Sequence, residues 1–395
     1  MLNNLEIFQY KDVKVYDFLT SGVFLINIIK NKIKNFFSIK FRFDLPRSKN
    51  IIQYDELNSD VLKKIIKKDF NTVPRRKLEI YFWIFIKQIF FFDLTFSTYL
   101  KNYVKFTSAK IIITLIDNSL IYYTLKDKID GVYFISIQNG HRTKKSFMFE
   151  NKNSLPFENL KCDHIFTFNK YFIKEYKKII KSDYHVLGCF NNNSVKVNQT
   201  QFKNSYLFVG GKDWHKMRIG ISHKLLSLLS KYFSDSNKKI NILLKNKNFK
   251  EQNNEINFYK KFFNNSNCIF HKSNTIAKSY KILDKFENII FTNSTLGYEA
   301  IARKKKIAVF AVNKNKIQRN LFGWPKEDQK KYNFFSAKKL NYTEIKRVLD
   351  NVNNCKQKNW EQKYYTYIKE LMYFDKNNSQ VRKVINSILK NKETR

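Results

Sequence analysis

The sequence predicts an α/β fold with two successive parallel-sheet halves. Short apolar runs rich in β-branched and aromatic residues alternate with stretches of helical length along most of the chain. Small polar turns follow several of these runs. A polar, asparagine-rich segment at 191–204 separates two such series, and a length of 395 residues suits two domains.

The first half is expected to begin with a helix over 23–37. A strand at 49–54 and a helix at 59–66 follow, with Ser59 or Asp60 as the helix cap. The aromatic-rich segment 77–105 is expected to be helical. The remaining elements are strands at 109–115, 131–137, 162–168 and 184–188, with helices at 120–127 and 171–180.

The second half repeats this alternation. A strand at 205–211 ends in a glycine turn, and a helix at 219–233 follows. Further strands are expected at 239–244, 268–270, 288–291 and 306–311, with a helix beginning near residue 298. Helices at 342–353, 358–372 and 378–391 complete the chain, and terminal helices of this kind can cross back onto the first half.

The turn at 291–300 is the most informative stretch. It lies at the carboxyl end of a predicted strand, where open α/β sheets bind ligands. Ser294, Thr295 and Gly297 offer hydroxyl and N–H groups at a helix start, which suit phosphate, and Glu299 offers a carboxylate, which suits a ribose diol. The alternative is an ordinary capped turn with Ser294 or Thr295 at the N-cap.

A second candidate site is the basic loop that follows the Gly210-Gly211 turn. Gly211 could let a phosphate approach the backbone, and Lys212, His215 and Arg218 could neutralise its charge. The alternative is a solvated basic loop, which is common in a chain this basic.

Two strand ends of the first half carry polar clusters. Asp117, followed by Asn118, could act as a base or a carboxylate nucleophile, or could simply cap a helix. His141, followed by Arg142, could act as a general base or a hydrogen-bond donor in a cleft, or could lie in an exposed capped turn.

The formal net charge is +41, and three interpretations are open. The charge could bind nucleic acid, or attract an anionic membrane surface, or reflect a compositional bias towards lysine. The lysines are scattered, which favours the third interpretation with weak membrane attraction added. The apolar stretch 80–94 is short for a membrane span, so a buried or a membrane-facing helix is expected there. The basic residues Arg75, Arg76 and Lys77 precede it and would allow interfacial docking.

The remaining composition suggests a cytoplasmic protein without cofactors. The four cysteines are far apart and form no metal-binding or disulfide pattern. No metal-binding motif is recognised, and the N-terminus does not resemble a signal peptide.

Five segments together resemble a known family. They are 137–142 (Ile-Gln-Asn-Gly-His-Arg), 162–168 (Cys-Asp-His-Ile-Phe-Thr-Phe), 186–190 (Val-Leu-Gly-Cys-Phe), 291–300 (Phe-Thr-Asn-Ser-Thr-Leu-Gly-Tyr-Glu-Ala) and 322–325 (Phe-Gly-Trp-Pro). This combination is similar to bacterial surface-carbohydrate biosynthesis proteins that resemble GT-B glycosyltransferases, including the retaining Kdo transferases and the capsule-polysaccharide and CDP-glycerol transferase group.

The resemblance implies a GT-B-like fold in which two Rossmann-type domains face each other across a cleft. The expected division is an acceptor domain at 1–190, a nucleotide-sugar domain at 205–340, and helices at 341–395 that cross back. The donor would be a CMP-, CDP-, UDP- or GDP-linked sugar, and the acceptor a surface glycan or a lipid-linked molecule in capsule, lipopolysaccharide or similar assembly, at the inner face of the cytoplasmic membrane.

The resemblance also implies residue roles. Ser294, Thr295 and Gly297 would meet phosphate, Glu299 would meet the ribose, and no metal would be needed. The acceptor would lie near Asp117 and His141, and a retaining reaction with a covalent step would use Asp117 or Asp213. Asn139 stands where the CDP-glycerol group has histidine, which disfavours the alternative of a polyol phosphotransferase. A non-enzymatic nucleic-acid or membrane-surface binding protein is a further alternative, although no nucleic-acid partner is expected.

Overall fold

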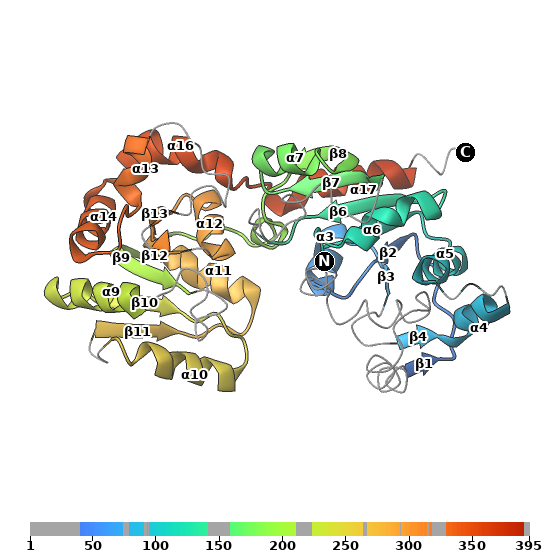
Figure 1. Cartoon of the computed structure of the whole chain (residues 1–395), viewed down its shortest axis with the longest axis horizontal. Helices are drawn as coiled ribbons and strands as arrows, with labels where there is room; N and C mark the ends of the chain where they lie inside the picture. Colours follow the sequence, from blue (N-terminus) through green and yellow to red (C-terminus); the bar gives the residue numbers. More distant parts are fainter. Residues whose placement is uncertain are drawn as a thin grey trace.

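Two parallel sheets, side by side along the long axis of the molecule, form the fold (Figure 1). The structure is a computed structural model. It describes residues 40–73, 79–90, 93, 95–140, 159–210, 223–263, 267–292, 294–310, 312–313, 316–317 and 329–390.

The first sheet has six parallel strands in the order β3-β2-β5-β6-β7-β8. Its central strands are apolar runs buried on both faces, as is usual in parallel sheets. The strands are β2 (Ile51–Gln53), β3 (Asn71–Thr72), β5 (Ile111–Thr114), β6 (Tyr133–Ile137), β7 (Leu160–Thr167) and β8 (Ile180–Val186). The accompanying helices are α3 (Ser59–Ile66), α4 (Phe82–Phe90), α5 (Phe96–Thr107), α6 (Leu120–Thr124), α7 (Lys170–Tyr176) and α8 (Phe190–Asn193). A small parallel pair, β1 (Lys40–Arg42) and β4 (Glu79–Tyr81), lies beside α4 (Figure 1).

The second sheet has five parallel strands in the order β11-β10-β9-β12-β13. The strands are β9 (Phe202–Val209), β10 (Ile240–Leu243), β11 (Cys268–His271), β12 (Phe286–Phe291) and β13 (Lys306–Val309). The helices are α9 (His223–Asp235), α10 (Phe249–Tyr259), α11 (Ile276–Lys285), α12 (Thr295–Ala302), α13 (Gln329–Phe335) and α14 (Tyr342–Asn354). Two short strands, β14 (Val312–Asn313) and β15 (Lys316–Ile317), pair antiparallel. From β9 the chain builds the sheet first towards β11 and then, from β12, in the opposite direction. The reversal makes the carboxyl ends of β9 and β12 the point at which such sheets bind ligands.

The C-terminal segment crosses back to the first half, as the sequence predicts. It runs through α15 (Gln357–Asn359), the π-helical turn Trp360–Tyr365 and α16 (Thr366–Ile368). Phe374 then pairs with Gly188 beside the first sheet. The last helix, α17 (Ser379–Lys390), lies along the first sheet (Figure 1) and contributes Val381 and Ile385 to the core that contains Ile51 and Leu62.

The segment 191–204 corrects one expectation, because it is more than a polar linker. It begins in α8, and Asn192 and Asn193 are fully buried. The amide of Asn193 donates to the Leu187 carbonyl at 2.9 Å and to Asn378 Oδ1 at 3.0 Å. These asparagines therefore tie the connecting segment to the returning C-terminal chain, since a buried amide needs hydrogen-bond partners.

Several local predictions are wrong in detail. The segment 77–105 contains strand β4 before helices α4 and α5, because Glu79–Tyr81 pairs with β1. Helix α3 has the predicted bounds, but Asn58 occupies its N-cap in a left-handed conformation without a side-chain cap bond, and Ser59 Oγ donates instead to the Glu56 carbonyl. Helices α10 and α11 lie where the sequence analysis predicts no helix. The helix predicted over 23–37 lies outside the described residues.

Within the part of the chain that the structure describes, no helix is both long and apolar enough to cross a bilayer. Nor do His, Cys, Asp or Glu side chains of those residues gather in a group of three that could hold a metal ion.

Candidate functional site

A pocket of about 210 Å³ lies at the carboxyl ends of β9, β10 and β12. It sits where the strand order of the second sheet reverses, and it also reaches the first half of the molecule. The lining residues used below are Asn139 and Asn191 from the first half and Gly210, Lys245, Lys247, Tyr280, Thr295 and Glu299 from the second. We call it the strand-end pocket.

The turn between β12 and α12 forms one wall of this pocket. Thr295 begins α12 and lines the pocket, whereas Ser294 is buried at the N-cap position and makes no side-chain cap bond. Gly297 packs against its own strand instead, because a Cβ atom there would lie 2.1 Å from the Phe291 ring. Close packing of helix on strand therefore accounts for this glycine without a ligand.

Glu299 faces the pocket from the second turn of α12 and is only 5% exposed. Burial raises the pKa of its carboxyl group, and hydrogen bonds from the Tyr280 hydroxyl and the Cys189 thiol oppose that rise. Cys189 comes from the first half and Tyr280 from the second, and their polar atoms lie 3.9 Å apart. Glu299 is thus an oriented carboxyl group at the junction of the two halves.

Two lysines that the sequence analysis did not select reach the pocket from the loop after β10. Lys247 Nζ donates to Ser273 Oγ at 2.5 Å and to Ser279 Oγ at 2.6 Å. Much of the Lys247 side chain is exposed, but its ammonium group lies against these two buried hydroxyls, and burial lowers its pKa to about 8. Lys245, on the same loop, adds a second cation.

A buried carboxylate shapes that loop. Glu255 on α10 is fully buried and accepts from the backbone N–H of Lys245 at 3.1 Å and of Asn246 at 3.2 Å. Burial raises the pKa of Glu255, and these hydrogen bonds oppose the rise. Gly210 packs closely against Tyr259 of the same helix, because a Cβ atom at position 210 would lie 2.5 Å from the Tyr259 hydroxyl. The backbone around the pocket is therefore tightly packed.

Asp117 lies behind the pocket rather than in its lining. Its side chain is fully buried, accepts from the Tyr176 hydroxyl at 2.5 Å and accepts from the Asn139 backbone N–H at 3.2 Å. The Tyr123 hydroxyl donates to the Asp117 carbonyl at 2.7 Å. Asp117 consequently holds the turn that carries Asn139 into the pocket. Asn118, the next residue, is absent from the lining of the pocket as the structure describes it.

The other predicted site residues lie outside the described residues. They are His141, Arg142, Gly211, Lys212, Asp213, His215 and Arg218. Lys245 and Lys247 could have been found by the strand-end rule that selected Asp117, because they directly follow the predicted strand 239–244.

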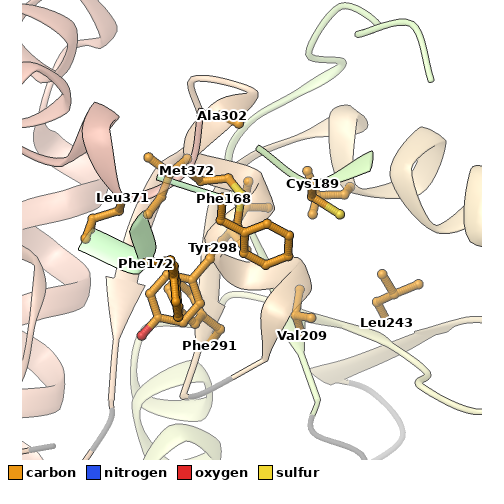
Figure 2. Packing of buried hydrophobic residues seen from close by; sticks show 14 of the residues in the cluster. Phe168, Phe172, Cys189, Val209, Leu243, Phe291, Tyr298, Ala302, Leu371 and Met372 are labelled. Carbon is orange, nitrogen blue, oxygen red and sulfur yellow. The ribbon is translucent and has the colours of Figure 1, made fainter. Parts of the chain in front are cut away.

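Apolar side chains join the two halves beside the pocket. Figure 2 shows Phe168 and Phe172, from the first half, beside Tyr298 and Phe291 of the second. Phe291 and Tyr298 meet edge to face with ring centroids 5.1 Å apart. All four residues belong to one buried cluster that also includes Leu371 and Met372 of the returning segment. Apolar packing therefore connects the first half to β12 and α12 of the second half.

Two parallel-sheet halves facing each other, with the last helix returned to the first, define the GT-B-like class of fold, as predicted. The chain is similar to a variant of the wall teichoic acid polymerase TagF, with a TM-score of 0.53 and 11% identity over 92% of this chain and 93% of that chain. It is also similar to a glycosyltransferase from Rickettsia africae, with a TM-score of 0.50 and 13% identity over 88% of this chain and 100% of that chain. At these identities the similarity establishes the fold.

The family follows from sequence. The chain belongs to the family described as "putative O-antigen biosynthesis protein", which matches residues 135–389. This match confirms the predicted resemblance to surface-carbohydrate biosynthesis proteins. Among curated protein sequences, none matches this chain.

Proposed function

We propose that this protein is a glycosyltransferase that moves a sugar from a nucleotide-activated donor to an acceptor in surface-glycan assembly. The strand-end pocket carries the proposal, because it combines two lysines, a helix start and an oriented carboxyl group where α/β sheets bind nucleotides. In this proposal residues 1–190 hold the acceptor, 205–340 hold the donor, and 341–395 connect the two.

The pocket divides by chemistry. Lys245, Lys247 and the first turn of α12 at Thr295 would bind the donor phosphates, because cations and helix N-termini favour anions. The same groups would stabilise the nucleotide phosphate as it leaves, without a metal ion. Glu299 would accept hydrogen bonds from the ribose.

Proton transfer would fall to groups on the first half or the basic loop. We propose His141 as the base, with Asn118, Arg142, His215 and Arg218 as substrate or phosphate contacts and Gly211 and Lys212 beside the donor. Asp117 would act through the Asn139 turn, because its carboxylate is already engaged there. If the reaction retains configuration through a covalent step, Asp213 is the better candidate for the nucleophile.

Two other functions are less well supported. A CDP-glycerol-type polyol phosphotransferase would use the same pocket, and the mass of the transferred group distinguishes it, because glycerol phosphate and a sugar add different masses to the acceptor. A nucleic-acid binding protein would be expected to gather its charge on one face. Instead, exposed lysines occur in both halves, including Lys101, Lys224, Lys260 and Lys383.

The donor class can be tested by thermal unfolding with CMP, CDP, UDP and GDP. At least one of these nucleotides is expected to raise the unfolding temperature, because a ligand at one hundred times its Kd stabilises the folded state by about 2.7 kcal/mol. A matching sugar-linked donor should then yield a product of increased mass on an acceptor. If none of the four nucleotides stabilises the protein, the proposal is wrong.

Lys247 gives this test a pH dependence. Because the pKa of Lys247 is lowered to about 8, its ammonium form is present below that pH and is lost above it. Nucleotide affinity is therefore expected to fall between pH 7 and pH 9. In Lys247→Met the affinity should be lower at pH 7 and nearly independent of pH. The exposed Lys250→Met on α10 serves as the control and should behave like the wild type.

We also propose that an anionic membrane surface is a partner. Helix α4 exposes Trp83 (52%) and Phe90 (78%), which lie seven residues apart and therefore on one face, and Phe43 nearby is 66% exposed. Trp83 Nε1 donates to the Phe43 backbone carbonyl at 2.8 Å, which places Trp83 beside Phe43. The exposed Lys87 lies on the same face of α4 as Trp83 and Phe90. Aromatic side chains beside cations suit the interface of an anionic bilayer.

Vesicle sedimentation tests this partner. The protein is expected to bind vesicles that contain phosphatidylglycerol more tightly than pure phosphatidylcholine vesicles, and less tightly at high salt. The double variant Trp83→Ser/Phe90→Ser should weaken binding at least about tenfold, because a buried large apolar side chain contributes about 1.5–3 kcal/mol. Phe249→Ser, which removes an aromatic residue 69% exposed on α10, is the matched control. An equal loss in both variants would contradict this assignment.

A further inference from the structure

A second pocket, of about 310 Å³, lies where the two halves meet. It is bounded by α3 and α17 of the first half, by the connecting segment that begins in α8, and by the start of α11 in the second half. Figure 1 shows α3 and α11 facing each other across this junction. We call it the junction pocket. It shares two lining residues, Asn191 and Ile276, with the strand-end pocket, so the two pockets adjoin.

Among the residues that the structure describes, three cations and no acidic residue line the junction pocket. Lys64 and Lys67 come from the end of α3, and Arg382 comes from the first turn of α17. None of these three forms an ion pair with any residue that the structure describes. Three cations gathered around one cavity repel each other unless an anion lies between them.

Polar atoms without partners also indicate that the junction pocket binds an anion. Arg382 Nε is buried and has no hydrogen-bond partner within the described residues, and neither has Asn191 Oδ1. A buried donor on a charged group is costly when it is left unsatisfied, so a ligand is expected to accept its hydrogen bond. An anion would satisfy Arg382, and a hydroxyl group on the same ligand would satisfy Asn191.

A helix N-terminus also opens onto the junction pocket. Ile276 and Ala277 are the first two residues of α11, a helix of ten residues. The N–H groups of a first helical turn have no intrahelical partner and carry partial positive charge, which favours phosphate. Apolar Val61, Ile65 and Val195 also line the pocket, which suits a phosphate attached to an organic group.

We propose that the junction pocket binds a phosphate or diphosphate group carried by the second substrate, the acceptor. The identification of the phosphate carrier as the acceptor rests on the proposed function, which requires the acceptor to lie next to the donor. The shared residues Asn191 and Ile276 meet that requirement. Arg382 holds the phosphate directly, and Lys64 and Lys67 neutralise its remaining charge. Because α3 and α17 belong to one half and α11 to the other, the bound phosphate also bridges the halves.

Isothermal titration of the full chain with inorganic pyrophosphate tests the site. Binding is expected at 0.1 M salt, and Arg382→Gln should weaken it by about tenfold or more. Lys383→Gln, the matched control, removes the same charge from an exposed neighbouring position on α17 that does not line the pocket, and should bind as the wild type does. If Arg382→Gln fails to fold, the exposed pair Lys64→Gln/Lys67→Gln provides the same measurement. Equal affinities of the pocket variants and the control would overturn the proposal.

Two further titrations separate this site from the donor site and identify the source of the phosphate. Pyrophosphate should still bind when the strand-end pocket is saturated with the nucleotide that stabilises the protein best, and full competition would overturn a separate site. Geranyl diphosphate should bind more tightly than pyrophosphate, as an acceptor with an organic group requires. Equal affinity would overturn the acceptor assignment and indicate a free inorganic ligand. If no nucleotide binds but pyrophosphate binding still depends on Arg382, the donor proposal fails and the junction pocket stands.

Discussion

Asp284→Ala is expected to lower the free energy of unfolding by about 3–5 kcal/mol, because it leaves a buried arginine without its counter-ion. Asp284 and Arg303 have fully buried side chains and pair through two hydrogen bonds of 2.6 Å. Arg303 also donates to Asn192 Oδ1 at 2.8 Å and to the Lys196 carbonyl at 3.1 Å. The pair thus fixes the connecting segment to the second half. Its loss should destabilise both the connecting segment and the second half.

Urea unfolding followed by tryptophan fluorescence measures this effect. Asp69→Ala is the control, because Asp69 is exposed and pairs with Lys49 at 3.3 Å, and exposed pairs contribute about 0–1 kcal/mol. The double variant Asp284→Ala/Arg303→Met should recover part of the lost stability, since it removes the unpaired charge. A loss no larger than that of the control would show that the pair does not hold the segment.

Glu299→Ala is expected to weaken donor binding by roughly 10- to 150-fold, because hydrogen bonds to a charged group contribute about 1.5–3 kcal/mol. Calorimetric titration with the nucleotide selected by the thermal screen measures this change. Glu299→Gln keeps the shape of the side chain and should retain part of the affinity. Glu251→Ala, an exposed carboxylate on α10, is the control. Unchanged affinity in Glu299→Ala would remove the ribose assignment.

The raised pKa of Glu299 also predicts how stability varies with pH. A buried carboxyl group whose pKa is raised binds its proton more tightly in the folded state than in the unfolded state. Its contribution to stability is present below the ordinary pKa of glutamate and is lost as pH rises through the raised value. Glu299→Gln cannot ionise and should lose this part of the pH dependence.

The sequence predicted the sheets and the βα turn well because buried parallel strands are visible as apolar runs. Strands β9 and β12 both end in turns that the sequence marks, with Gly210 after one and Ser294 after the other. Thr295 and Glu299 lie in the strand-end pocket for the same reason, since their position follows from the strand end and the helix period.

Helix α10 was not predicted because the face that it buries is partly polar. Helix α10 buries Gln252 and Glu255, which hold the loops around the strand-end pocket. Helix α11, by contrast, also buries Tyr280, Ile282 and Leu283, so its apolar periodicity is visible in the sequence. Hydrophobic periodicity cannot reveal a helix whose inward face carries amide, carboxylate and hydroxyl groups. The polar contacts that shape the strand-end pocket therefore make α10 hard to predict from sequence.

The other features that could not be predicted depend on contacts between residues far apart in the sequence. The hydrogen bond between Tyr176 and Asp117 joins residues 59 positions apart, and no local sequence pattern predicts it. The junction pocket likewise depends on Arg382 of α17 meeting Lys64 of α3. The sequence predicted that the last helix would return to the first half, but its register against α3 follows only from the packed structure.

The returning helix α17 also bears on how the chain is made. Val381, Ile385, Ile388 and Leu389 fill a core otherwise built from residues 51–190. During translation those earlier residues leave the ribosome long before their missing helix exists. The second half, by contrast, has its strands and the helices α9 to α14 in one continuous stretch, from β9 to α14. The second half can thus complete its sheet while the first still exposes an apolar surface, so the nascent chain is expected to need protection from aggregation until its last helix is released.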